Sequence, residues 1–160
     1  MTMERYHNIL QDEDYQGLLA KLEEYEADRI YCCHDLTHAL DVARMMYIFS
    51  LEEASGLEQD VIYATALLHD IGRVAQYETQ EPHHQASVRI AEGILQKYGY
   101  TQGEMSEILD AIAMHRGENQ DQLLGEYLYR ADKLSRNCFC CKASDTCKWP
   151  ESKKNKSVVI

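Results

Sequence analysis

The sequence predicts an all-α protein, and three observations lead to that prediction. Apolar residues recur three or four positions apart along most of the chain, which is the spacing of one helix face. The alternation of β-branched residues that is typical of strands is almost absent. Only two prolines occur, Pro82 and Pro150, and both fall at apparent boundaries between segments. We therefore expect a bundle of about six helices.

The expected helices follow from their apolar stripes and from the residues that end them. The first two carry stripes through Ile9 and Phe49, and Gly56 ends the second. Gly72 and Gly99 end the third and the fourth, which are separated by a polar loop. The last two helices are predicted from isoleucine, alanine and leucine residues at helical spacing. The expected bounds are residues 5–27, 34–54, 58–71, 83–98, 102–115 and 120–135, with the loop at 73–82.

Composition limits the classes of function. The formal net charge of −11 argues against a nucleic-acid polymer as partner, because such binding needs clustered lysine and arginine. A phosphorylated substrate remains compatible, because bound cations would reverse the local field. The charged first ten residues do not resemble a signal peptide, and no apolar run approaches the about 20 residues of a membrane span. We expect a cytoplasmic protein with no membrane contact, and no pattern indicates its oligomeric state.

Residues that can bind a metal ion share the apolar stripes of several expected helices. Buried polar groups are costly unless they are satisfied, and one metal ion satisfies several of them at once. Imidazole and carboxylate ligands suit Fe, Mn, Ni, Co or Zn, and the lack of thiolates among them argues against a closed structural zinc site. The residues with this pattern are His38, His69, Asp70 and Asp132.

The segments that carry these residues resemble the HD-domain superfamily of metal-dependent phosphohydrolases, and specifically its members with an HD-I-G signature. The resemblance covers about residues 31–136 and rests on HDLTHALDV from His34, LLHDIGR from Leu67 and ADKL from Ala131. It implies an HD-domain bundle over residues 1–137. It also implies a divalent transition metal bound by His38, His69, Asp70 and Asp132.

The resemblance further implies that one or two ions are bound. Family members with two metals use two more histidines, and the aspartate of the HD pair bridges the ions. The matching positions here are His83 and His115. His83 is preferred to His84 because the segment HHQAS resembles the family segment in which the ligand stands four residues before a small one. We favour two metals over one, although His83 and His84 also suit a solvated helix start.

The chemistry implied is hydrolysis of a phosphomonoester, phosphodiester or phosphoanhydride in a small substrate, for which we expect a nucleotide. Asp70 would bridge the metals. His34 lies one helical turn before His38, where it would donate a proton to the leaving oxygen or simply cap the helix. Lys133 would act on the reacting phosphate. The cationic or polar residues expected to bind phosphate are Arg73, His84, Lys133 and Arg136.

Two other functions fit the same ligand order. Some helical relatives with two irons use oxygen to cleave carbon bonds, so a di-iron oxygenase of the HD fold is one alternative. A non-catalytic domain that binds a nucleotide and signals through a partner is the other. The complete ligand set weakens the regulatory alternative, because a degraded site would be expected to lose a ligand.

Six cysteines occur, and four of them lie between residues 138 and 147. Without an export signal, a disulfide framework is not expected. Cys138, Cys141 and Cys147 are candidate ligands of a structural zinc ion, with Cys32 or Cys33 as a fourth. The alternatives are a redox-sensing thiol pair and, as the favoured interpretation, reduced cysteines that pack as small hydrophobes. We expect residues 138–160 to form a cysteine-rich segment with a mobile tail at 151–156, and no separate domain.

Overall fold

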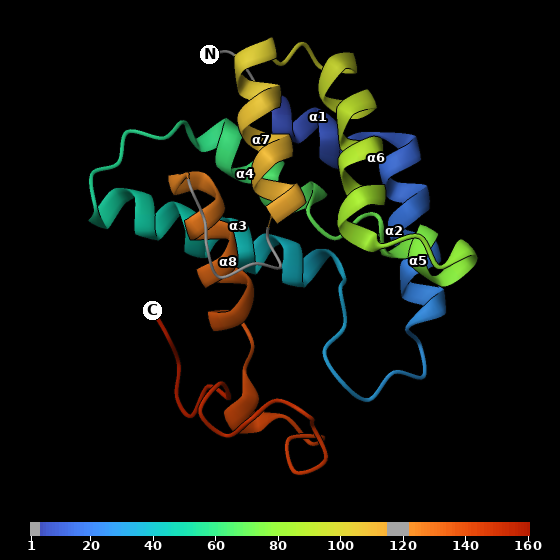
Figure 1. The fold of residues 1–160 in the computed structure, drawn as a ribbon, viewed down its shortest axis with the longest axis vertical. Coiled ribbons are helices and arrows are strands. Elements are labelled where there is room, and N and C mark those ends of the chain that lie inside the picture. The colour runs from blue at the N-terminus through green and yellow to red at the C-terminus, as the bar shows by residue number, and fades with distance from the viewer. Residues whose placement is uncertain (1–3, 115–121) are drawn as a thin grey trace.

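The computed structural model describes residues 4–114 and 122–160, and the regular elements of these residues are all helices (Figure 1). The all-α prediction is confirmed. None of the helices described is long and apolar enough to cross a membrane. The elements are α1 (Arg5–Gln11), α2 (Glu13–Tyr25), α3 (Leu36–Glu52), α4 (Gln59–Leu68), α5 (Arg73–Thr79), α6 (His83–Lys97), α7 (Gln102–Met114), α8 (Leu123–Leu134) and the 3₁₀ turn η1 (Cys138–Cys140).

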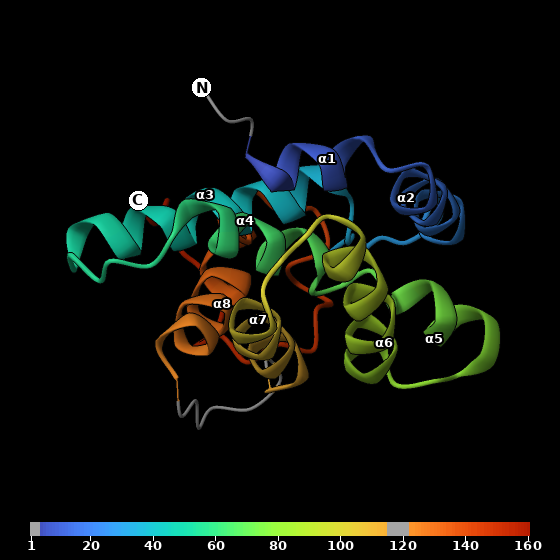
Figure 2. The same cartoon turned by 90° about the horizontal axis from the view of Figure 1, so that it is seen from above.

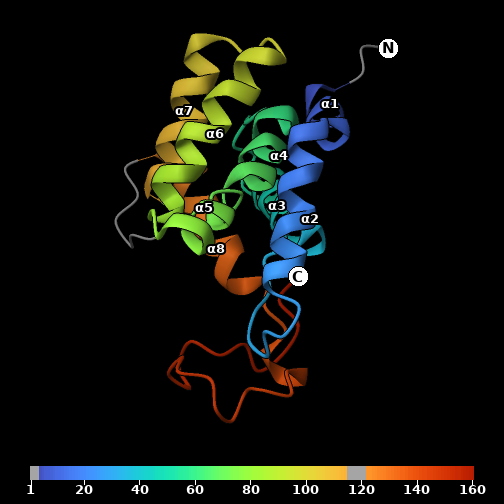
Figure 3. The same ribbon diagram turned by 90° about the vertical axis from the view of Figure 1, so that its right-hand side faces the viewer.

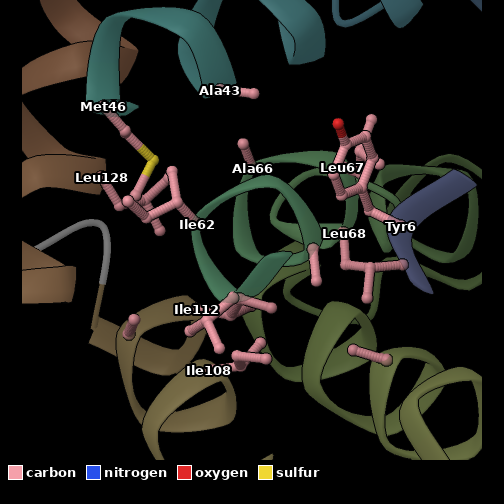
Figure 4. Packing of buried hydrophobic residues seen from close by; sticks show 14 of the residues in the cluster. Tyr6, Ala43, Met46, Ile62, Ala66, Leu67, Leu68, Ile108, Ile112 and Leu128 are labelled. Atoms are coloured by element: carbon pink, nitrogen blue, oxygen red, sulfur yellow. The ribbon is translucent and has the colours of Figure 1, made fainter. Parts of the chain in front are cut away.

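Helix α4 forms the centre of the bundle. It contacts α1, α3, α7 and α8, and Figure 2 shows it between α3 on one side and α7 and α8 on the other. Seven of its ten residues are buried, as expected for a helix that is apolar around most of its circumference. Ile62 of α4 packs in the same core as Met46 of α3 and Leu128 of α8 (Figure 4). The chain that leaves α4 therefore starts from the most firmly packed part of the molecule.

The single first helix expected over residues 5–27 is wrong, because the chain breaks at Asp12. Asp12 has an extended backbone, with φ −66° and ψ 128°, and it separates α1 from α2. Its carboxylate accepts hydrogen bonds from the Tyr15 backbone N–H at 2.9 Å and from Lys97 Nζ and Tyr98 Oη at 2.6 Å each. Asp12 thus caps α2 and ties it to the end of α6.

The polar loop expected at residues 73–82 is also wrong in part, because it contains α5. This helix has seven residues and buries only Val74. Such a short helix with one buried apolar side chain offers no measurable periodicity in the sequence. It ends at Gln80, which adopts a left-handed conformation with φ +64°. Helix α5 packs against both α2 and α6.

The C-terminal segment turns back toward the loop that joins α2 to α3 (Figure 3). Tyr31 Oη of that loop donates to the Thr146 carbonyl at 3.2 Å. Asn155 Nδ2 donates to the carbonyls of Lys133 at 2.9 Å and Arg136 at 2.7 Å, which satisfies acceptors at the end of α8. The Asn155 contacts lie within residues 151–156, for which the sequence suggested a mobile tail.

We predict that Asp12→Asn lowers the free energy of unfolding by about 1 kcal/mol at pH 7, because it keeps a cap but removes a charge. Burial would raise the pKa of Asp12, but hydrogen bonds from Lys97 and Tyr98 outweigh it and lower the pKa to about 2. Since the ordinary value is 3.8, this stabilisation is complete above that pH and is lost as the pH falls toward 2. The difference in urea unfolding between wild type and variant should therefore narrow at pH 3.

The matched control for this experiment is Asp14→Asn, which removes an exposed carboxylate from the same first turn of α2. It should change stability little at either pH. An Asp12→Asn effect that is the same at pH 7 and pH 3 would show that the charge of Asp12 is not what stabilises this junction.

Candidate metal centre

Four side chains that are distant in the sequence meet beside the end of α4. His38 lies on α3, His69 and Asp70 follow α4, and Asp132 lies on α8. One ligand atom from each residue lies within 4.8 Å of all the others. Asp70 Oδ2 is 3.0 Å from His69 Nε2 and 3.7 Å from His38 Nε2, and Asp132 Oδ1 is 3.1 Å from His38 Nε2 and 3.5 Å from His69 Nε2. We call this set the metal cluster, and it contains the residues that the sequence predicted for a first metal.

The backbone after α4 fixes the orientation of His69. The His69 side chain is fully buried, and its Nδ1–H donates to the Ala66 carbonyl at 2.6 Å. A carbonyl oxygen can only accept, so Nε2 is the ring nitrogen that faces the carboxylates of the metal cluster. A backbone partner on the far nitrogen is the arrangement found in histidines that bind metals.

The metal cluster favours a positive charge. Burial would raise the pKa values of Asp70 and Asp132, but the neighbouring histidines outweigh burial and hold both values well below 3.8. Burial would lower the pKa of His69, but Asp70 and Asp132 outweigh it and raise that pKa to about 10. Two ionised carboxylates therefore share a nearly dry site with two imidazoles. A divalent transition metal fits this donor set in place of a proton.

His83, which the family resemblance implies as a ligand of a second metal, lies near Asp70. It is buried at the start of α6, and its Nε2 lies 3.7 Å from Asp70 Oδ1. The two oxygens of Asp70 therefore face different histidines, Oδ2 toward His69 and Oδ1 toward His83. His84 is less buried and does not line the cleft described next. His115, the other expected ligand, lies outside the described residues.

A cleft of about 610 Å³ opens beside the metal cluster, and Asp132, His34 and His83 line it. Three residues expected to bind phosphate also line it, but His84 does not. Lys133 Nζ lies 2.7 Å from Asp132 Oδ2, and Arg73 Nε lies 3.0 Å from Asp70 Oδ1. Two cationic residues of the wall were not anticipated from the sequence. The five cationic side chains of the cleft are Arg29, Arg73, Lys133, Arg136 and Lys148.

His34 lines the cleft, and a partner that the sequence did not reveal orients its ring. Glu26, at the end of α2, accepts from the His34 backbone N–H and from His34 Nδ1–H, each at 2.7 Å. Tyr77 of α5 donates to the same carboxylate at 2.8 Å. Burial would raise the pKa of Glu26, but these hydrogen bonds lower it to about 2. Burial lowers the pKa of His34, so a neutral ring directs its Nε2 lone pair away from Glu26.

Comparison with known proteins establishes the family. A family model described as the HD domain matches residues 35–137, which is more than half of the chain. The chain belongs to the HD-domain family. This agrees with the superfamily of metal-dependent phosphohydrolases that the sequence motifs resemble, and the metal cluster supplies its histidines and aspartates.

Relatives of this HD-domain protein differ in length. An uncharacterized protein of Clostridium beijerinckii is 42% identical over 153 residues, which cover 96% of this chain and 97% of that protein. Ribonuclease Y of Acetivibrio thermocellus is 30% identical over 101 residues, which cover 62% of this chain but only 17% of the ribonuclease. The crystal structure of a predicted HD superfamily hydrolase from an uncultured Thermotogales bacterium shares the fold, with a TM-score of 0.66, 22% identity, and coverage of 88% of this chain and 79% of that one.

Gly72 holds α6 close to the turn that carries Asp70, and we predict that Gly72→Ala destabilises the protein by about 2 to 3 kcal/mol. An added Cβ would lie 2.3 Å from both the His83 carbonyl oxygen and the Ser87 backbone nitrogen. These backbone atoms cannot move without displacing α6. The Gly72 N–H also donates to Ser87 Oγ at 2.8 Å, so the two segments are already in direct contact.

Gly93→Ala is the matched control, because Gly93 lies inside α6 and an added Cβ meets nothing within 4 Å. This change should stabilise the helix by about 0.5 to 1 kcal/mol. Chemical denaturation of the Gly72→Ala and Gly93→Ala variants measures the change in the free energy of unfolding for each. Equal effects of the two substitutions would contradict the close approach at Gly72.

Proposed function

We propose that this protein is a metal-dependent phosphohydrolase that acts on a small phosphorylated compound, a nucleotide by chemical class. The observation that carries the proposal is that the metal cluster borders a cleft lined by cationic side chains, with Asp132 belonging to both. The cluster suits a cation and the wall suits an anion. Phosphoryl chemistry needs both charges side by side.

The residues that would hold the metal are His38, His69, Asp70 and Asp132, and Fe, Mn, Ni, Co and Zn all accept such a set. A second ion would be held by Asp70 together with His83 and His115. A bound divalent ion supplies Lewis acidity and a hydroxide at neutral pH. We favour two ions because Asp70 has a histidine on each side.

The cationic wall would bind the phosphate group. Arg73 and Lys133 each contact a carboxylate of the metal cluster through the oxygen that faces away from the other cluster residues. From these positions they would neutralise the phosphate oxygens and orient the bond to be broken. A volume of about 610 Å³ lies in the range of small-molecule sites. The local positive charge contrasts with the net charge of −11 for the chain.

His34 would transfer the proton. Its Nδ1–H is held by Glu26 at 2.7 Å, which leaves Nε2 for the substrate side of the ring. Since burial lowers the pKa of His34, its ring is neutral, so Nε2 would first take a proton from the attacking water and would then donate that proton to the leaving oxygen. Glu26 acts as a positioning residue, and Asp70 and Lys133 complete the proposed catalytic set.

The named relatives bear on the choice of substrate. Ribonuclease Y of Acetivibrio thermocellus is 30% identical to this chain over 101 residues, so a short RNA belongs among the compounds to be tested. The acidic composition of this chain favours a small substrate over a nucleic-acid polymer. Nucleoside monophosphates, diphosphates and triphosphates, cyclic dinucleotides and a short RNA form a suitable panel.

We predict that the wild type purified without a chelating column binds one to two metal ions at the metal cluster and hydrolyses a member of this panel when Mn²⁺ or Fe²⁺ is present. His69→Ala should lose the ions of the metal cluster and the hydrolysis, because it removes a buried ligand of that cluster. His34→Asn should keep the metal but lower kcat about a hundredfold, because it removes a proton-transfer group. His7→Ala, an exposed histidine on α1, is the matched control and should change neither property.

Three outcomes would contradict the proposal. Metal content that His69→Ala leaves unchanged would remove its basis. Bound iron with oxygen consumption and no phosphate release would favour the di-iron oxygenase. Tight nucleotide binding without turnover would favour the regulatory domain.

A further inference from the structure

Four of the six cysteines meet at a second cavity, which is separate from the metal cluster. Its volume is about 190 Å³, and its lining includes cysteines from the loop before α3, from η1 and from the C-terminal segment. The structure contains free thiols and no disulfide at these positions. The four cysteines that line this cavity, which we call the four-thiol cavity, are Cys32, Cys138, Cys141 and Cys147.

The selection of cysteines is specific. Cys33 is adjacent to Cys32 in the sequence, and Cys140 is adjacent to Cys141, yet neither lines the four-thiol cavity. The turn η1 explains part of this selection, because the Cys141 N–H donates to the Cys138 carbonyl at 3.2 Å and closes a tight turn between the two. A C-x-x-C pair on a turn is the usual half of a structural zinc site.

The charge around the four-thiol cavity suits a thiolate cluster. Arg136 and Lys154 line it, and Lys154 is only 8% exposed. Lys154 Nζ donates to the Ser144 carbonyl at 2.6 Å and to Glu151, whose side chain is 71% exposed. Burying an ammonium group is costly unless an anion lies near it. A zinc ion with four thiolates carries a net charge of about −2. Arg136 and Lys154 would offset part of this charge, since Lys154 also pairs with Glu151.

The thiols influence one another. Burial raises the pKa of Cys32, Arg136 opposes this effect, and Cys138, Cys141 and Cys147 raise the pKa further. Without a metal, Cys32 therefore stays protonated. Metal binding would release protons from the thiols, as it does in other cysteine sites.

We propose that Cys32, Cys138, Cys141 and Cys147 bind a structural zinc ion. Among the described residues, the metal cluster is the only group of three or more possible ligands whose atoms all lie within 4.8 Å of one another. The four sulfurs of the cavity are farther apart than this, so zinc binding would have to draw them together. The segment 141–149 carries two of the cysteines and contains no helix, so it can adjust. The zinc ion would cross-link the loop before α3 to the C-terminal segment.

This cross-link would support the cleft. Cys32, Cys147 and Trp149 line both the cleft and the four-thiol cavity, so these residues form a wall that the two share. Fixing that wall would hold Lys148 and Arg136 in place on the cleft side. The supporting role rests on the proposed function, whereas zinc binding itself does not.

The test measures zinc by mass spectrometry in the His69→Ala background, so that ions in the metal cluster do not contribute. We expect about one zinc ion per chain, and its loss in Cys138→Ser and Cys141→Ser. Cys33→Ser and Cys140→Ser are matched controls and should retain the zinc. Co²⁺ should replace it and give the sulfur-to-cobalt charge-transfer absorption that only thiolate ligands produce.

Limited proteolysis gives an independent measurement. Removing zinc with a chelator should expose residues 138–160 to protease while the helical bundle of the His69→Ala protein stays intact by circular dichroism. The proposal is overturned if the protein binds no zinc and all six thiols react freely, if fewer than six thiols are present because a disulfide forms, or if the control variants lose zinc equally. Each of these results leaves the proposed hydrolase activity to be judged separately.

Discussion

The burial of two carboxylates and two imidazoles at the end of an apolar helix is the constraint on which the rest of the structure depends. Ionised groups in such a place are costly unless charges of the opposite sign compensate them. Helix α4 is buried over most of its surface, so Asp70 cannot turn toward bulk water. His38 and Asp132 must reach the same point from α3 and α8, which fixes how these helices pack around α4.

Charge is arranged in two layers around this point. The inner layer is negative, because Asp70 and Asp132 remain ionised, and it selects a cation. The outer layer is positive, because five cationic side chains line the cleft, and it selects an anion. Although the net charge of the chain is −11, nearly a third of its 16 lysines and arginines line this one cleft. An anionic substrate would therefore be attracted to the cleft despite the overall charge.

The metal cluster could be predicted from the sequence because His38, His69 and Asp132 each share an expected helical stripe with apolar residues, as His38 does with Val42, and because Asp70 adjoins His69. The helical class followed from the same periodicity. The break at Asp12 was missed although Asp12 caps α2 locally by accepting from the Tyr15 N–H, and only its contact with Lys97 on α6, 85 residues away, lies beyond sequence reasoning. Glu26 was missed because it reaches His34 through a loop with no repeating pattern. The gathering of four cysteines at one cavity also depends on tertiary packing, since spacing alone left Cys32 and Cys33 equivalent.

Anomalous diffraction from crystals of the Mn²⁺-loaded protein tests directly whether the metal cluster binds a metal ion. We expect a peak between His38 Nε2, His69 Nε2 and the facing oxygens of Asp70 and Asp132. A second peak beside the other oxygen of Asp70, near His83, is predicted if two ions bind. Crystals that contain manganese but show no peak at the metal cluster would contradict the account.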